Sequence, residues 1–296
     1  MKKVLFATTA LVATAGVAAA DVTFGGYGRF GVIYSDPDGG DSDTNITSRL
    51  RLQIDMTAES DAGVTFGGRF RLEGEERDAR NGDRPQFNGA RLFARSGGLE
   101  VAVGNIFGAI EFMPGQYTID LGLTGLGYDY TVYGTGGADA FSSGGLGNAG
   151  DNGVEVLYSA GDFSAHFSYS ETNDRFAGHV AYTFGDFTAA LGAQSSDDDG
   201  DTELSVALEG ALGAFDFGVA YADNGTNGDH YSIMGRVDVG ASTNVEFYVA
   251  DADTFDDTSY GVDFNHNMGG GTSLRGGIAS LGSGETRADL GVRFNF

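Results

Sequence analysis

Several residue types are missing or scarce in this 296-residue sequence. It contains no cysteine and no tryptophan, only three prolines, and no lysine beyond Lys3. Without cysteine there is no disulfide framework to hold the fold together. After residue 20 there is also no apolar run near the roughly 20 residues that a transmembrane helix needs. These absences exclude a disulfide-stapled domain and a helical membrane protein.

Positive charge is scarce as well. The chain has 17 Lys and Arg against 42 Asp and Glu, a formal net charge of −25. A nucleic-acid partner requires a basic surface, so this balance excludes nucleic acid. Cations, or solutes that pass a negative entrance, are the more natural partners.

The N-terminus has the pattern of an export signal. Lys2 and Lys3 precede an apolar stretch over residues 4–17, and three alanines end it at Ala20. This order predicts a signal peptide over 1–20, cleaved after Ala20. The mature chain would then be a single domain over 21–296, with arginine as its only strong cation.

Period-two alternation runs through the rest of the chain and is clearest at its end. There Ala288, Leu290, Val292, Phe294 and Phe296 share one face of a strand. The same alternation between turn residues predicts sixteen strands. They cover residues 22–35, 45–58, 63–77, 85–96, 98–105, 152–160, 163–171, 176–184, 187–196, 202–211, 214–222, 230–239, 244–253, 257–266, 271–281 and 285–296.

No helical layer is available to cover the apolar strand faces. An all-β, transmembrane antiparallel barrel of sixteen strands resolves this, because its apolar face meets lipid and closure pairs every strand edge. Barrels of roughly 16 to 18 strands leave an aqueous lumen. The connections alternate between short turns and longer acidic loops, which predicts a periplasmic side and an outer side.

One connection is much longer than the others. Residues 106–151 contain no clear strand, and a stretch of that length in a compact domain is functional or a mistaken assignment. We expect this third outer loop to fold into the lumen as a constriction loop. Two missed strands in this window, giving eighteen in total, are the alternative.

The polar faces of the early strands carry a set of arginines. An arginine that faces lipid would cost roughly 2–4 kcal/mol near the midplane, so these side chains are predicted to line the lumen. Acids of residues 106–151 would oppose them and create a transverse field. The alternative is that the arginines only pair with Asp55, Glu73 and their neighbours. The predicted wall comprises Arg29, Arg49, Arg51, Arg69, Arg71, Arg91 and Arg95.

Five short stretches resemble a known family. They are Gly26-Tyr27-Gly28-Arg29-Phe30-Gly31, Ser48-Arg49-Leu50-Arg51, Gly63-Val64-Thr65-Phe66-Gly67, Val103-Gly104-Asn105 and Ala288-Asp289-Leu290-Gly291-Val292-Arg293-Phe294. In these the sequence resembles the Gram-negative general porins, especially those of the Rhodobacter type. The resemblance implies a homotrimer in the bacterial outer membrane, in contact with its lipid, that lets small hydrophilic solutes and ions diffuse passively.

The resemblance also implies roles for individual residues. Phe296 would be the signal that the outer-membrane assembly machinery recognises, and no cofactor is required. The basic wall of the constriction would be Arg29, Arg49, Arg51, Arg69, Arg71 and Arg91. The acids of the constriction loop would be Glu111, Asp120 and Asp129.

Two further groups have the chemistry of metal ligands. Asp197, Asp198, Asp199 and Asp201 could hold Ca²⁺ through several oxygen atoms, or simply keep a loop solvated. His166 and His179 share the lumen phase of neighbouring strands. They could form a metal pair, although solvated wall residues are the simpler interpretation.

Two other functions stay open. A barrel enzyme needs a nucleophile beside an oriented base, and the four histidines are scattered with no motif around any serine. A substrate-specific channel often has an aromatic path, which the tyrosines of residues 106–151 leave open. These are Tyr117, Tyr128, Tyr130 and Tyr133.

Overall fold

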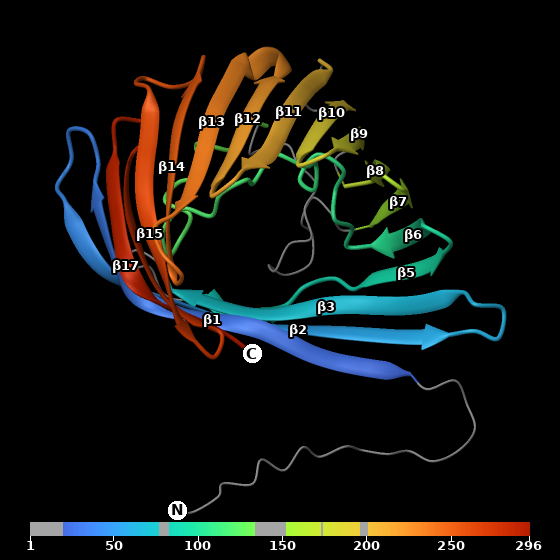
Figure 1. Cartoon of the computed structure of the whole chain (residues 1–296). Coiled ribbons are helices and arrows are strands. Elements are labelled where there is room, and N and C mark those ends of the chain that lie inside the picture. Colours follow the sequence, from blue (N-terminus) through green and yellow to red (C-terminus); the bar gives the residue numbers. More distant parts are fainter. Residues whose placement is uncertain (1–19, 77–82, 134–151, 173, 196–200) are drawn as a thin grey trace, which may run out of the picture.

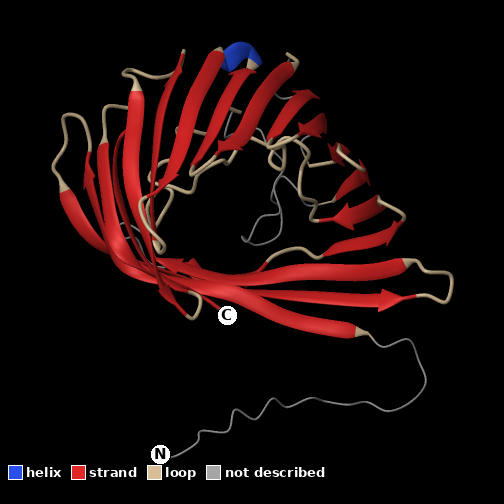
Figure 2. Ribbon diagram, in the orientation of Figure 1, coloured by secondary structure: helices blue, strands red, loops and turns tan. Residues whose placement is uncertain are grey.

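The computed structural model describes residues 20–76, 83–133, 152–172, 174–195 and 201–296. In them, seventeen strands form one antiparallel sheet that closes on itself (Figures 1 and 2). The strands are β1 (Asp21–Asp36), β2 (Asp43–Glu59), β3 (Thr65–Glu76), β4 (Asp83–Phe87), β5 (Arg91–Ser96), β6 (Leu99–Gly104), β7 (Gly153–Ala160), β8 (Phe163–Ser170), β9 (Arg175–Phe184), β10 (Phe187–Ser195), β11 (Glu203–Leu212), β12 (Phe215–Asp223), β13 (Asp229–Asp238), β14 (Thr243–Ala252), β15 (Ser259–Gly269), β16 (Thr272–Ser280) and β17 (Thr286–Asn295). A single 3-10 turn, η1 (Gly225–Asn227), precedes β13.

The ring has sixteen positions, because β4 and β5 lie end to end beside β3. Leu72 of β3 pairs with Phe87 of β4, and Arg69 pairs with Arg91 of β5. Closure comes from β1, which pairs with β2 on one side and β17 on the other. The predicted sixteen-stranded antiparallel barrel is confirmed, and the eighteen-stranded alternative is wrong. None of the described residues form a helix long and apolar enough to span a bilayer.

Alternation sorts the side chains of each strand onto two faces. On β12, Val219 and Tyr221 are 44 % and 39 % exposed, whereas Ala220 and Ala222 between them are 2 % and 1 % exposed. Successive side chains of a strand point to opposite faces, so the apolar residues form the outer surface and the small or polar ones face inward. The outer surface therefore suits lipid contact.

Two-residue turns at one end of the barrel join neighbouring strands. Gly161, Gly185 and Gly213 begin three of them with φ values of 58°, 64° and 71°. Glycine adopts this left-handed conformation without steric cost, which is why these short turns contain it. The chain ends in the ring as well, since the backbone of Phe296 exchanges two hydrogen bonds with that of Gly26, at 3.0 and 3.1 Å.

Residues 105–133, here called the inner segment, form neither helix nor strand and run inside the ring of strands (Figure 1). Their apolar side chains pack against small residues on the inner faces of the later strands. This buried cluster comprises Met113, Ile119, Leu121, Leu126, Tyr130 and Val132 of the inner segment with Ala181, Ala190, Ala207, Ala220, Ala222, Met234, Tyr248, Ala250, Ala279 and Leu281. The packed core of the protein thus lies between the inner segment and one side of the barrel wall. The remainder of the predicted constriction loop, residues 134–151, lies outside the described residues.

Candidate functional site

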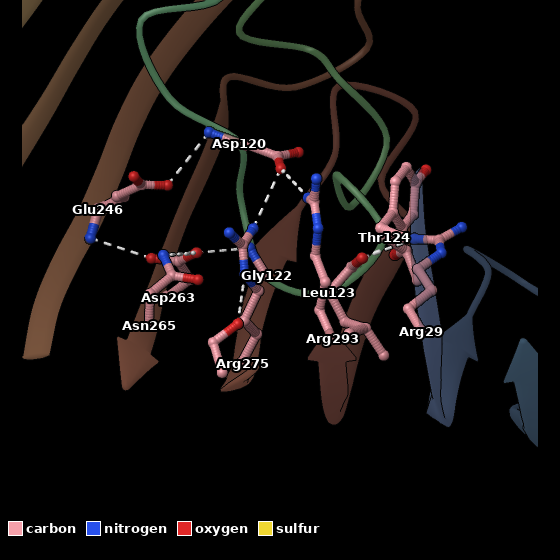
Figure 3. Close-up of polar contacts among 12 residues, drawn as sticks. Arg29, Asp120, Gly122, Leu123, Thr124, Glu246, Asp263, Asn265, Arg275 and Arg293 are labelled. Atoms are coloured by element: carbon pink, nitrogen blue, oxygen red, sulfur yellow. Dashed lines mark hydrogen bonds and ion pairs between the residues drawn. The ribbon is translucent and has the colours of Figure 1, made fainter. Parts of the chain in front are cut away.

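Three carboxylates from the barrel wall hold the middle of the inner segment. Glu246 of β14, Asp263 of β15 and Asp289 of β17 lie on one rung, because Glu246 pairs with Asp263 and Gly277 pairs with both Asp263 and Asp289. All three carboxylates are largely buried. Glu246 accepts the backbone N–H of Asp120 at 3.1 Å, and Asp263 accepts that of Gly122 at 2.5 Å (Figure 3). Asp289 accepts the backbone N–H groups of Leu123 at 2.9 Å and Thr124 at 2.8 Å.

These bonds aim the side chain of Asp120 at two arginines. Its Oδ2 accepts Nη1 of Arg275 at 3.1 Å and Nη1 of Arg293 at 3.0 Å (Figure 3). Asp120 is half-exposed, so this acid and the two guanidinium groups border the open interior. A carboxylate of the inner segment thus meets arginines of β16 and β17.

Arg29 of β1 connects this site to the early strands. Its Nη1 donates to the carbonyl of Leu123 at 2.6 Å, and its Nη2 donates to Glu75 at 2.7 Å. The predicted wall residue is therefore buried beneath the inner segment.

The other wall arginines of β2 and β3 pair with acids between them. Cross-strand register places Arg49 opposite Glu75, Arg51 opposite Glu73, and Asp55 opposite Arg69. Arg49 bonds Glu75 at 2.5 Å, Arg69 bonds Asp55 at 2.5 Å, and Arg51 is paired with Glu73. Arg71 donates instead to the Gln53 side chain at 3.1 Å. The pairing considered as an alternative from the sequence is present in the structure.

Two guanidinium groups, one from β2 and one from β17, lie over the same aromatic ring. The ring of Tyr27 has Arg293 of β17 at 4.3 Å from its centroid and Arg51 of β2 at 5.2 Å. The hydroxyl of Tyr27 accepts a bond from Arg49 at 3.0 Å. Because β17, β1 and β2 are neighbours in the ring, Arg293 and Arg51 form a row of guanidinium groups with Arg275 along this part of the wall.

Arg91 has a different role from the rest of the wall. It is buried on β5, donates to Glu155 at 2.5 Å and to Glu100 at 2.6 Å, and lies 3.9 Å from the centroid of the Phe107 ring. Glu155 also accepts the backbone N–H of Phe107 at 3.0 Å. This cluster attaches the beginning of the inner segment to β5 and β7.

The two lumen-phase histidines contact this beginning of the segment too. Their rings lie 5.6 Å apart, as their strand phase predicted, but the residues are only 2 % and 6 % exposed. His166 bonds Glu155 at 2.8 Å, and His179 bonds the carbonyl of Ala109 at 2.6 Å. The interpretation as solvated wall residues is therefore wrong, because both side chains are buried and hydrogen-bonded within the protein.

The other two predicted acids have no arginine partner within the described part of the chain. Glu111 accepts hydrogen bonds from the Tyr117 and Tyr133 hydroxyls, and Asp129 accepts the backbone N–H of Gly282 at 2.8 Å. Burial raises the pKa of Glu111 above its ordinary value, although these two hydroxyls act in the opposite direction. Of the predicted acids, Asp120 is the one that meets arginines.

The calcium prediction falls mostly outside the described residues, which include Asp201 but not Asp197, Asp198 or Asp199. Within the described ranges, no group of three His, Asp or Glu side chains is placed to hold a metal ion. Calcium binding therefore stays a prediction.

Comparisons with known proteins identify the family. A family model described as Gram-negative porin matches residues 7–286. The chain belongs to this family. It is 32 % identical to a porin of Fuscovulum blasticum and 32 % identical to a porin of Rhodobacter capsulatus, in both cases over 93 % of this chain and 100 % of the relative. A solved structure of a Rh. blastica porin mutant superimposes with a TM-score of 0.82 at 28 % identity, again over 93 % of this chain and 100 % of the other.

The sequence did not single out the carboxylates that hold the inner segment of this porin. Glu246, Asp263 and Asp289 each lie on the polar face of their strand, opposite apolar neighbours. A charged residue between two outward-facing apolar residues was the available signal in the sequence. Only the register of four successive strands shows that these positions share one level of the wall.

Proposed function

We propose that this porin is an outer-membrane channel for passive diffusion of small hydrophilic solutes and ions, narrowed by its inner segment. The observation that carries the proposal is a closed sixteen-position ring with an apolar outer face and a charged inner wall. Such a ring satisfies all backbone groups in lipid and encloses water. The family indicates a channel rather than an enzyme.

The narrow zone of the channel would have a transverse field. Asp120 supplies negative charge from the inner segment, and Arg275 and Arg293 supply positive charge from the barrel wall. Arginine stays protonated at every relevant pH, so the field would persist over a wide range. Oriented water in such a field favours polar solutes, because an apolar solute displaces that water without replacing its interactions.

The mature protein would begin after Ala20 and assemble as a homotrimer. Gly26 and Gly28 of β1, with Ala94 of β5, are small residues among the early strands that would allow close subunit contact. Phe296 lies beside Gly26 at the closure of the ring and is exposed, which leaves it accessible to the assembly machinery as a terminal signal.

Planar bilayer recording tests the channel directly. Purified protein should produce large stepwise conductance increases, in groups of three if the trimer inserts as a unit. Conductance should rise in proportion to salt concentration for a general diffusion pore. Absence of steps from folded protein would refute the channel, and saturation with one particular solute would favour a substrate-specific channel instead.

A further inference from the structure

A polar cavity lies along the wall from β13 to β17, next to the short turns. Its volume is about 510 Å³, and it borders the rung that holds the inner segment, because its lining residue Asn265 bonds Asp263 of that rung at 3.3 Å. Cross-strand register places Asp238, Asn244, Asn265 and Arg275 side by side on four successive strands. Polar side chains therefore form one continuous lining, here called the rim cavity.

Arg236 of β13 lines the rim cavity and is weakly committed to the protein. Among the described residues, its ion pair is with Asp238 at 3.8 Å, beyond hydrogen-bond distance, although the register places Asp216 and Glu246 on the two neighbouring strands beside it. Its Nε is buried without a hydrogen-bond partner in the same set of residues. By contrast, Arg49 and Arg69 on the opposite wall bond carboxylates at 2.5 Å. Arg236 therefore has donor capacity for a solute.

Arg275 supplies a second guanidinium group. Its Nη1 bonds Asp120 at 3.1 Å, and its Nε makes a long bond of 3.4 Å to the Ser273 hydroxyl. Asn265 adds an amide whose nitrogen bonds the Asn244 side chain at 3.3 Å and whose oxygen is buried without a partner among the described residues. The lining thus combines two cations and one acid, Asp238, with neutral amide and hydroxyl groups.

The acids next to the rim cavity are engaged by other donors. Glu246, opposite Arg236 in the register, accepts the backbone N–H of Asp120, and Asp263 accepts the backbone N–H of Gly122 and, at 3.3 Å, the Asn265 amide. Asp120 is shared between Arg275 and Arg293. The Asp238 side chain is 58 % exposed, where water screens its charge.

The shape of the rim cavity allows entry. The turn glycines Gly240, Gly269 and Gly270 border it, and a Cβ added to any of them would meet nothing within 4 Å. Its volume falls in the range of small-molecule sites, which is about 300–1,000 Å³. An open mouth predicts rapid exchange.

The geometry points to a subsite for small anionic, polyhydroxylated solutes, such as sugar phosphates or sugar acids. Guanidinium groups bind phosphate and carboxylate oxygens through paired, charge-assisted hydrogen bonds. The amides of Asn244 and Asn265 and the Ser273 hydroxyl match sugar hydroxyls. The inference rests on the proposed channel function and gives it a local preference, despite the net charge of −25.

Glucose 6-phosphate is the probe and glucose the uncharged control. Added at the turn side of a single channel, the phosphate should reduce current in a saturable manner, whereas glucose at the same concentration should not. Arg236→Gln should raise the half-blocking concentration by about tenfold, which is the loss of one charge-assisted hydrogen bond. Arg95→Gln is the matched control, because Arg95 is an exposed arginine of β5 outside the cavity.

The outcomes separate the subsite from the channel. Block that survives Arg236→Gln, or falls equally in Arg95→Gln, overturns the subsite. Block by inorganic phosphate at the same half-blocking concentration overturns the role of the hydroxyl groups. Normal conductance without any block refutes only this inference, whereas lack of conductance in the unmodified protein refutes the proposed function.

Discussion

Replacing Asp289 should release the middle of the inner segment while the barrel stays closed. The Asp289 carboxylate is 6 % exposed and accepts three bonds, from Leu123 N at 2.9 Å, Thr124 N at 2.8 Å and Thr124 Oγ1 at 2.7 Å. The Thr124 hydroxyl can rotate toward another acceptor, but the backbone N–H groups of Leu123 and Thr124 cannot. Asp289→Ala leaves both donors buried and unpaired.

The expected cost follows from those two donors. Each buried, unsatisfied donor costs about 1–3 kcal/mol, so attachment of the segment should weaken by about 2–6 kcal/mol. Even the lower limit changes the ratio of attached to detached segment roughly 30-fold. Glu246 and Asp263 still hold the backbone at Asp120 and Gly122, so the release should be local.

Gly122→Ala tests the same contact from the other side. Gly122 has φ of +66°, and a Cβ there would lie 2.5 Å from Asp289 Oδ1. The methyl group must therefore displace the carboxylate or shift the segment, in addition to a strained backbone conformation. Both variants should behave alike although they alter different elements.

Single-channel recording provides the assay. Both variants should show larger or noisier open-channel current, while the temperature at which the barrel unfolds on a gel changes little, because no strand pairing is lost. Asp186→Asn removes the same charge from an exposed turn and serves as control. If Asp289→Ala and Gly122→Ala conduct with the amplitude and noise of the Asp186→Asn channel, the carboxylate does not hold the segment.

Three more results are expected. Asp120→Asn frees Arg275 and Arg293 from their shared acid. The K⁺/Cl⁻ permeability ratio from reversal potentials should therefore fall about two- to fivefold, which is the effect of one charge at contact distance in water. An unchanged ratio would place Asp120 outside the ion path. Glu111 lies outside the membrane-spanning strands, and burial raises its pKa above the ordinary 4.5. The folded state therefore binds the Glu111 proton more tightly, and the stability of the protein should fall as the pH rises from 4.5 through the raised pKa. Glu111→Gln should abolish this slope in thermal unfolding, and an identical slope in both proteins would contradict the assignment. Deleting Phe296 should lower the amount of folded protein in the outer membrane several-fold, and normal amounts on heat-modifiability gels would argue against a terminal signal.

The ring could be predicted from the sequence because its signal is local and repeated. Each strand has period two, and turn residues separate the strands, so all sixteen segments overlap a position in the barrel. The break between β4 and β5 could not be predicted, since it depends on one contact between strands. Asn88 accepts the backbone N–H of Arg71 at 2.7 Å through its side chain, where a continuous strand would use its own backbone.

Strand phase also predicted which way the wall arginines face, but not their partners. Partners depend on register, which sets Arg49 opposite Glu75 only once the lengths of both strands and their turn are fixed. The inner segment has no period at all, so its sequence does not reveal which acid reaches a cation. Asp120 does so because Asp263 and Asp289 fix the backbone that follows it.

These pairings bear on how selectivity arises. Arg29, Arg49 and Arg51 share Glu73 and Glu75, so these two acids offset most of the positive charge of the three arginines. The proposed field across the channel therefore does not require a large excess of arginine. It depends on position, because Asp120 lies on the inner segment while its cationic partners belong to the barrel wall. Moving the segment should consequently change selectivity as much as removing a charge, which is why Asp289, though it touches no solute, is expected to influence ion preference.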